Sequence, residues 1–326
     1  MARCSICGEP AVYTNRLTGK SYCKKHFLEY FDRKIRRTIR KYKMFGPKEH
    51  IVVATSGGKD SLSLLYYLYR LSQKVPGWRV SALLIDEGIR GYREYTITDF
   101  KKLVDKLGIP YRIVRFKDVF GYTLDEIFRI GREKGLPYLP CSYCGVFRRY
   151  LLNKTAREMN GTVLATAHNL DDTVQTFLMN VIRNSWDRVV RQGPVTGVLE
   201  HPKFVKRVKP FIEVPEKETA TYALLNGLVT PEFYECPYIQ YNMRIYIRRY
   251  VNELEEKYPG TKYSLLRSML SIIDMLKDRV QAGEIQSCKI CGEPSSHPIC
   301  RTCYYRYKLG LLKPEEEEIA RKYIRE

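Results

Sequence analysis

The chain has 326 residues, 44% of them hydrophobic, which is enough for a substantial core in about two domains and excludes fibrous and disordered proteins. The 56 Lys and Arg residues outnumber the 36 Asp and Glu residues, and this net charge of +20, with 26 Tyr for stacking, favours a nucleic-acid partner over an ordinary basic enzyme. Neither a secretory signal nor an apolar run of roughly 18 residues is visible, so we expect a soluble, cytoplasmic protein without a membrane partner.

The first cysteines lie close to the N-terminus. The chain contains 10, which in a reducing compartment favours metal or redox chemistry over disulfides. Cys4 and Cys7, followed by Cys23 and His26, have the spacing of two ligand pairs that close a tetrahedral site. Because four ligands leave no open position, we predict a structural Zn²⁺ module over residues 1–30.

Residues 31–47 are predicted to form a basic linker helix. Ile35 and Ile39 give it one apolar stripe, while Lys and Arg occupy most other positions. Such a surface could follow an RNA backbone, which needs charge and little base reading; an ordinary solvated helix is the alternative. Other clusters that mix Lys or Arg with Tyr or Phe, and are expected to add to an RNA surface, lie at 203–209, 244–249 and 301–308.

A glycine-rich turn comes next, between a β-branched run at 50–55 and an apolar stretch at 62–71 that suits a helix packed on a sheet. Glycines let backbone amides approach phosphate oxygens, and the helix start adds positive potential. The turn is not a Walker A loop, which requires glycine at Val53, and a merely structural turn is the alternative. The predicted nucleotide-binding residues are Ala54, Ser56, Gly57, Gly58, Lys59, Asp60 and Ser61.

Strands and helices then alternate, which predicts an α/β doubly wound parallel sheet with its ligand at the carboxyl ends of the strands. The strand ends carry Asp86, Ala167 and His168. Of the two acids that follow, one is expected to be an ordinary helix-start residue, and Asp172 is preferred to Asp171 as the Mg²⁺-linked carboxylate. The further strands and helices are expected, in chain order, at 80–86, 95–107, 111–116, 124–134 and 162–167.

Three cysteines stand apart from the terminal pairs. Cys141 and Cys144 follow a stretch with two prolines, and Cys236 lies far along the chain. If the fold brings them together, three thiolates could hold an iron–sulfur cluster with one iron left open. A catalytic pair with persulfide and disulfide chemistry, a third Zn²⁺ site and inert buried cysteines are the alternatives that spacing leaves open.

From about residue 211 the pattern becomes helical, with Cys236 in a loop that returns to the site and helices expected at 216–228, 244–257 and 263–280.

Two more Cys-x-x-Cys pairs follow and offer four thiolates to a second structural Zn²⁺: Cys288, Cys291, Cys300 and Cys303. The phrase Cys-x-Ile-Cys-Gly-Glu-Pro occurs in both terminal modules, and its glycine permits a tight metal-binding turn. The expected domains are a zinc finger at 1–30, the linker helix at 31–47, the nucleotide-binding domain at 48–215, a helical extension at 216–284 and a zinc finger at 285–326.

Together these motifs resemble those of the PP-loop N-type ATP pyrophosphatases. Residues 56–61 are similar to the PP-loop, and residues 167–172 match the second motif of that superfamily. Adding Cys141, Cys144 and Cys236 between two zinc modules narrows the resemblance to the TtcA/TtuA family of tRNA 2-thiolation enzymes, across essentially the whole chain.

The resemblance implies an ATP-dependent tRNA 2-sulfurtransferase that adenylates the C2 oxygen of a uridine before sulfide attacks C2 and AMP leaves. It implies a [4Fe-4S] cluster on the three cysteines, ATP phosphates on Lys59 and the PP-loop, and Asp172 as an acidic catalytic or Mg²⁺-linked residue. Arg148 stands where the family has a basic catalytic residue, and Arg suits phosphate charge more than proton transfer. The implied partners are tRNA, a ubiquitin-like thiocarboxylated sulfur carrier and a second copy in a homodimer.

Within this family the T-loop 5-methyluridine at tRNA position 54 is the preferred target, and the wobble uridine at position 34 is the alternative. A non-catalytic zinc-finger RNA-binding protein belongs to another functional class, but the intact Lys59, Asp60 and Asp172 argue against it. Amide transfer to a small metabolite would need a glutaminase or ammonia channel, and no such segment is visible.

Overall fold

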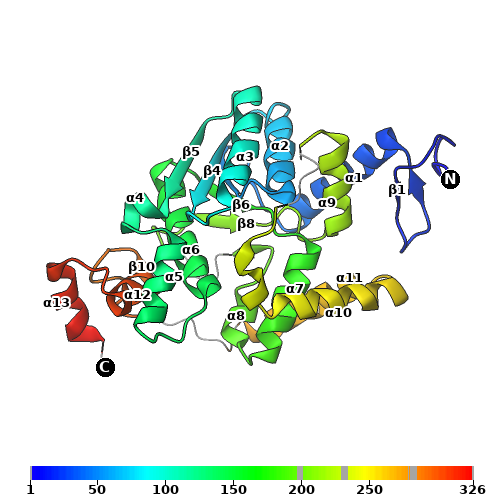
Figure 1. Ribbon diagram of the computed structural model, residues 1–326. Coiled ribbons are helices and arrows are strands. Elements are labelled where there is room, and N and C mark those ends of the chain that lie inside the picture. The colour runs from blue at the N-terminus through cyan, green and yellow to red at the C-terminus, as the bar shows by residue number, and fades with distance from the viewer. Residues whose placement is uncertain (1, 197–200, 229–233, 278, 280–284, 325–326) are drawn as a thin grey trace.

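The computed structural model describes residues 2–196, 201–228, 234–277, 279 and 285–324. Its centre is a six-stranded sheet in the order β5-β4-β3-β6-β8-β7 (Figure 1). The strands are β3 (Glu49–Thr55), β4 (Trp78–Asp86), β5 (Tyr111–Arg115), β6 (Val163–Thr166), β7 (Val195–Thr196) and β8 (Lys206–Val208). All neighbouring strands are parallel except the short edge pair β7 and β8.

Both faces of the sheet are covered by helices, so the predicted doubly wound α/β fold is confirmed. Alternation along β3 explains the two layers: Ile51 and Val53 pack into one core, and Val52 packs into the other. The first core is closed mainly by α1 (Lys24–Lys41), α2 (Lys59–Ser72), α3 (Arg93–Leu107), α7 (Leu170–Ile182) and α9 (Glu216–Leu225). The second is closed by α4 (Phe116–Phe120), α5 (Leu124–Glu133) and α6 (Pro140–Glu158).

The edge strand β7 and its neighbour β8 are absent from the sequence prediction. They are short, and β8 carries Lys206 and Arg207 where a buried strand would carry apolar residues. Pairing with β6, through Leu164 opposite Arg207, fixes β8 in the sheet in spite of its charge. The strand therefore depends on its tertiary neighbour and not on local propensity.

The basic helix also differs from expectation. It begins at Lys24 inside the N-terminal module, and Lys34 points into the protein, with only 6% of its side chain exposed. Its Nζ lies 2.8 Å from the Glu218 carboxylate of α9, which is itself 1% exposed. A buried carboxylate requires a cation, and removing either partner alone would cost about 3–5 kcal/mol. Not all of the charge on this helix is therefore available to RNA.

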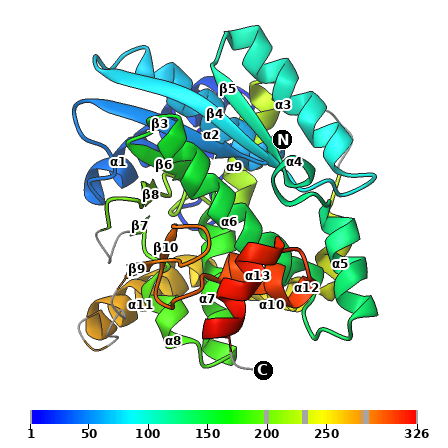
Figure 2. The same ribbon diagram turned by 90° about the vertical axis from the view of Figure 1, so that its left-hand side faces the viewer.

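The two terminal modules lie at opposite ends of the molecule (Figure 1). The N-terminal module has the hairpin β1 (Tyr13–Thr14) and β2 (Ser21–Tyr22) and leads directly into α1. The C-terminal module packs beside α6 and α5 (Figure 2), with Tyr305 and Leu309 in the second core. It consists of β9 (Gln286–Ser287), β10 (Pro294–Ser295), α12 (Arg301–Leu309) and α13 (Pro314–Tyr323).

The remaining helices follow α7 and α9: α8 (Trp186–Val190), the 3₁₀ helix η1 (Pro237–Tyr241), α10 (Arg244–Lys257) and α11 (Thr261–Leu276). Residues 278 and 280–284, at the end of the expected helical extension, lie outside the described residues, as do 325–326 at the end of the expected C-terminal finger. Among the described helices, none is long and apolar enough to cross a membrane.

Candidate functional site

Both terminal sets of predicted metal ligands are brought together by the fold. The ligand atoms of Cys4, Cys7, Cys23 and His26 lie within 4.8 Å of one another, and so do those of Cys288, Cys291, Cys300 and Cys303. Gly8 and Gly292, directly after the first pair of each set, have φ values of 75° and 68°, which permit the tight turn. Each set can hold one tetrahedral ion with no vacant position.

The nucleotide loop lies between β3 and α2, as predicted. Gly57 has a φ of +81°, and a Cβ there would lie 2.0 Å from the backbone oxygen of Thr96, so only glycine fits. The Ser61 hydroxyl accepts from the Ser56 amide at 3.0 Å and donates to the Gly58 carbonyl at 2.9 Å. The loop is therefore closed by its own side chains, with Gly58 as the cap of the helix that starts at Lys59.

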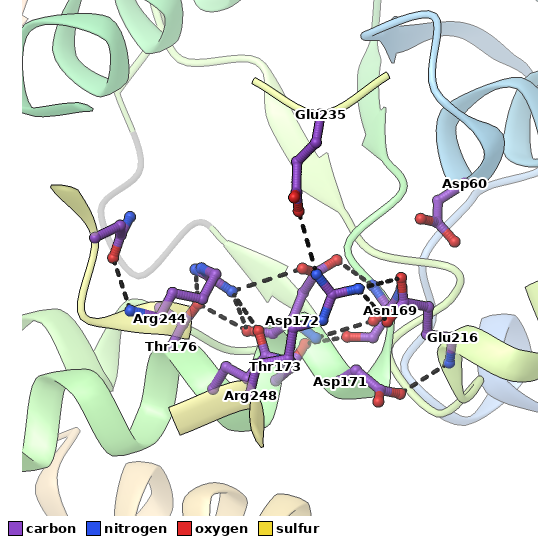
Figure 3. Close-up of polar contacts among 12 residues, drawn as sticks. Asp60, Asn169, Asp171, Asp172, Thr173, Thr176, Glu216, Glu235, Arg244 and Arg248 are labelled. Atoms are coloured by element: carbon purple, nitrogen blue, oxygen red, sulfur yellow. Dashed lines mark hydrogen bonds and ion pairs between the residues drawn. The ribbon is translucent and has the colours of Figure 1, made fainter. Parts of the chain in front are cut away.

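Carboxylates hold Lys59 in place. Its Nζ lies 2.9 Å from Asp60 and 2.7 Å from Glu216 of α9. Arg248 of α10 approaches the same Glu216 at 3.3 Å and also contacts Glu235 at 3.4 Å (Figure 3). The cations on this side of the site are thus neutralised by neighbouring acids, and α9 and α10 are tied to the nucleotide loop.

The two adjacent acids at the start of α7 have different surroundings (Figure 3). Asp171 is buried and forms an ion pair with Lys262, so its role is structural. Asp172 caps the helix with Asn169, contacts Arg244 at 3.6 Å and keeps 39% of its side chain exposed. The surrounding protein excludes enough water to raise the pKa of Asp172 to about 6, although Arg244 opposes this. The geometry supports the preference for Asp172.

The other predicted nucleotide residues lie at the ends of adjacent strands. Ala54 of β3 pairs with Leu83 of β4 on one side and Thr166 of β6 on the other. Asp86 ends β4 and accepts from the Gly88 amide at 2.8 Å. Ala167 and His168 follow β6, and the His168 ring hydrogen-bonds Thr166 at 3.0 Å. Burial lowers the pKa of His168 well below its usual value, so its ring is neutral.

The three remaining cysteines lie together beside the carboxyl end of β4. Cys141 and Cys144 are on the first turn of α6, and Cys236 directly precedes η1. The Cys141 Sγ lies 3.8 Å from the Tyr238 carbonyl, and Cys141 is an electrostatic neighbour of both Cys144 and Cys236. Tyr238 fixes this segment by donating to Asp125 of α5 at 2.6 Å.

This arrangement fits a cluster better than a reactive thiol or a single ion. Burial raises the pKa of all three cysteines, that of Cys144 to about 12, whereas nucleophilic cysteines need a lowered pKa. A cationic metal group would restore the thiolate form. Among the described residues, only the two terminal sets have ligand atoms that all lie within 4.8 Å of one another, so the three central thiols are more widely spaced. An iron–sulfur cluster can accept wider spacing than a single ion because its ligands bind different irons.

Two charged residues that the sequence did not single out connect the thiols to the nucleotide loop. Glu87, which follows β4, is 1% exposed; it forms an ion pair with Arg93 and lies 3.5 Å from Arg148 and 4.0 Å from the Cys144 Sγ. Arg93 also donates to the Ser56 carbonyl at 2.6 Å. The only signal in the sequence that could have identified Glu87 was its position directly after a predicted strand, next to Asp86.

Comparison with known proteins agrees with this geometry. A model described as a PP-loop domain matches residues 28–252, and one described as the N-terminal LIM domain of the 2-thiouridine synthetase TtuA matches residues 3–28. The tRNA-5-methyluridine(54) 2-sulfurtransferase of Pyrococcus horikoshii is 38% identical over 305 residues, which cover 93% of each chain. The chain belongs to the PP-loop family of tRNA 2-thiolation enzymes.

Family members named for different target uridines are similar to the chain. The sulfurtransferase of Thermus thermophilus with the same name is 32% identical over 96% of this chain and 95% of its own length. A solved structure described as the U34-tRNA thiolase NcsA from Methanococcus maripaludis with its [4Fe-4S] cluster has a TM-score of 0.80 and 35% identity. It covers 96% of this chain and 98% of its own.

Proposed function

We propose that this protein is an ATP-dependent tRNA 2-sulfurtransferase that converts the T-loop 5-methyluridine at position 54 to 2-thioribothymidine. The observation that carries the proposal is the meeting of three part-buried thiols with a nucleotide loop through Glu87 and Arg93. The relatives from Pyrococcus horikoshii and Thermus thermophilus, both named for position 54, support the choice of uridine.

ATP would bind with its phosphates on the amides of the loop at 56–61 and on Lys59. Attack of the uridine C2 oxygen on the α-phosphate forms an O–P bond and releases pyrophosphate, which makes that oxygen a good leaving group. Asp172 and Asp60 offer carboxylates for Mg²⁺ beside the phosphates. Arg148 stabilises the negative charge of the adenylated intermediate.

The second step replaces the activated oxygen with sulfur and expels AMP. Cys141, Cys144 and Cys236 would hold a [4Fe-4S] cluster, and the bound cluster would supply iron that can carry the sulfur. Glu87 orients Arg148 beside these thiols. The His168 ring is neutral, so it adds no positive charge beside that of Arg148. The sulfur would come from the thiocarboxylated C-terminus of a ubiquitin-like carrier protein, where hydrolysis of the C–S bond by water would release sulfide and leave a carboxylate.

The terminal modules are proposed to hold one structural Zn²⁺ each, because three thiolates with one imidazole, or four thiolates, are donor sets that zinc prefers. A homodimer remains our expectation for the assembly. Metal analysis of anaerobically purified protein should give two zinc ions and four irons with acid-labile sulfide per chain.

The deciding experiment is nucleoside mass spectrometry of tRNA incubated with the reconstituted enzyme, ATP and sulfide under anaerobic conditions. We expect 2-thioribothymidine together with stoichiometric AMP and pyrophosphate. Activity in protein that contains zinc but no iron would exclude the cluster as the carrier of the sulfur. Binding of tRNA without AMP release would instead indicate a non-catalytic RNA-binding protein.

Thiolation of the wobble uridine at position 34 is the second candidate. It is supported by the similarity to the U34-tRNA thiolase of Methanococcus maripaludis and to the tRNA 2-thiolation protein NcsA of Haloferax volcanii, which is 33% identical over 316 residues. The same assay separates the two candidates. Replacing the target at position 54 abolishes the product only if position 54 is thiolated, and replacing the uridine at position 34 abolishes it only if position 34 is thiolated.

A further inference from the structure

Four basic side chains gather on and around β8, which lies on the other side of β6 from β3 and its nucleotide loop. Arg207 lies on β8 and Lys209 directly after it, while Arg149 lies on α6 and Arg188 on α8. Arg149 has Arg188 and Arg207 as electrostatic neighbours, and Lys209 has Arg207. We call these four residues the β8 cation cluster.

The β8 cation cluster has neutral hydrogen-bond partners. The Arg207 Nε donates to the Thr196 hydroxyl at 3.1 Å, and the Lys209 Nζ donates to the Gln192 carbonyl at 2.6 Å. In the described part of the chain, no carboxylate forms an ion pair with any of the four. Asp172 acts on Lys209 only at longer range.

The rest of the site is different, since its cations have acidic partners. Lys59 contacts two carboxylates, Arg93 pairs with Glu87 and Arg244 lies 3.6 Å from Asp172. Among the residues that the structure describes, positive charge without an acidic partner is therefore a local property of the β8 cation cluster and not of the whole site. Mutual repulsion of this kind destabilises the free protein, and a bound anion would offset it.

The backbone also makes room for one member of the cluster. The Arg149 side chain folds back along α6 toward Cys144 and passes over Gly145. A Cβ at Gly145 would lie 3.2 Å from a guanidinium nitrogen of Arg149, so the glycine leaves space for this conformation. Arg149 keeps an exposed side chain, and Arg148, Arg207 and Arg188 lie close enough to repel its charge. Burial and then Arg207 lower the pKa of Lys209 to about 7.

We propose that the β8 cation cluster binds the RNA phosphates that flank the target uridine and so brings its C2 oxygen to the nucleotide. This inference rests on the proposed function. A phosphodiester backbone repeats its charge and can meet cations on three separate elements, whereas a single carboxylate or thiocarboxylate can neutralise only one. Arginine forks match phosphate oxygens bidentately, and three of the four residues are arginine.

The test is direct binding of tRNA without ATP, measured by fluorescence anisotropy over a salt series. For Arg207→Gln/Lys209→Gln we expect roughly tenfold weaker binding and a salt slope smaller by about 0.7–0.9 for each phosphate that the variant no longer neutralises. Arg149→Gln alone, at an exposed position, should show a smaller decrease in affinity, and Arg149→Lys should recover part of it. Circular dichroism and iron content verify that the variants are folded.

A matched control removes two charges elsewhere. Lys102→Gln/Arg112→Gln changes two exposed cations, 64% and 49% exposed, on α3 and at the start of β5. This variant should bind tRNA within a factor of about two of wild type, because its residues lie away from the carboxyl ends of the strands.

Other outcomes would overturn the inference. Unchanged tRNA affinity in the double variant excludes phosphate binding, and weakened binding of ATP alone would assign the cluster to the nucleotide. Weakened use of a thiocarboxylated carrier with normal tRNA affinity would assign it to the sulfur donor. Because binding is measured without turnover, a wild-type protein that binds tRNA but does not thiolate it would contradict the proposed function and leave this inference standing.

Discussion

The terminal metal modules and the central cysteine site use the same Cys-x-x-Cys unit in opposite ways. Each terminal module adds a second ligand pair nearby in sequence and closes four ligands within 4.8 Å. The central pair on α6 is completed by one cysteine from a distant segment, next to Glu87 and the nucleotide loop. A closed site stabilises a fold, and an open one leaves a position for chemistry.

Cys144→Ser should give the largest effect. Loss of a ligand at the open site is expected to reduce thiolation by more than about a hundredfold, because even changes beside metal ligands cost 10- to 100-fold. The protein should lose its iron and keep two zinc ions, as measured by elemental analysis. Retained iron with full activity would mean that the three cysteines do not form the metal site.

Cys300→Ser tests the closed site on the other side of the comparison. Metal binding contributes on the order of 10 kcal/mol to the folding of isolated zinc-finger peptides, so α12 should lose its docking on the second core. We expect rapid proteolysis within residues 285–324, loss of one zinc and a smaller decrease in activity than for Cys144→Ser. Loss of iron instead of zinc from this variant would contradict the separation of the metal sites into a closed and an open kind.

Glu87→Gln probes the buried carboxylate beside the open site. Because Glu87 contacts both Arg93 and Arg148, its neutralisation should lower kcat by about 10- to 100-fold while ATP affinity changes less. Visible spectroscopy of the iron chromophore separates this effect from cluster loss. Glu133→Gln, in an exposed pair with Arg129 on α5, is the matched control and should behave like wild type.

The smallest expected effect is a pH dependence at the edge of the open site. The pKa of Lys209 is lowered to about 7 by burial and by Arg207, with Asp172 acting in the opposite direction. Between this pKa and that of an unfolded lysine the unfolded chain binds more protons, so the free protein becomes more stable as pH rises from about 7 to 10. Affinity for tRNA should fall over the same range by about fivefold. Lys209→Arg should flatten the titration measured by anisotropy.

The predicted elements agree closely with the structure where local signals are strong. The helix expected at 244–257 is observed as Arg244–Lys257, and the strand expected at 80–86 is observed as Trp78–Asp86. The strand β8 was missed, because charged side chains in a three-residue strand give no periodic signal. Lys34 was expected on a charged surface and is instead buried, because its partner Glu218 lies in a distant helix.

Sequence alone determined the parts of this protein whose chemistry is local. The ligand pairs with two residues between their members, the glycine that must adopt positive φ and the strand followed by a phosphate-binding turn each occupy only a few consecutive positions. Only the tertiary structure decided which charges compensate one another: Glu87 joins Arg93 to Arg148, Glu216 holds Lys59, and the β8 cation cluster is left without an acidic partner among the described residues. Electrostatic energies depend on distance and burial, and these are set by contacts between segments that are remote in the chain.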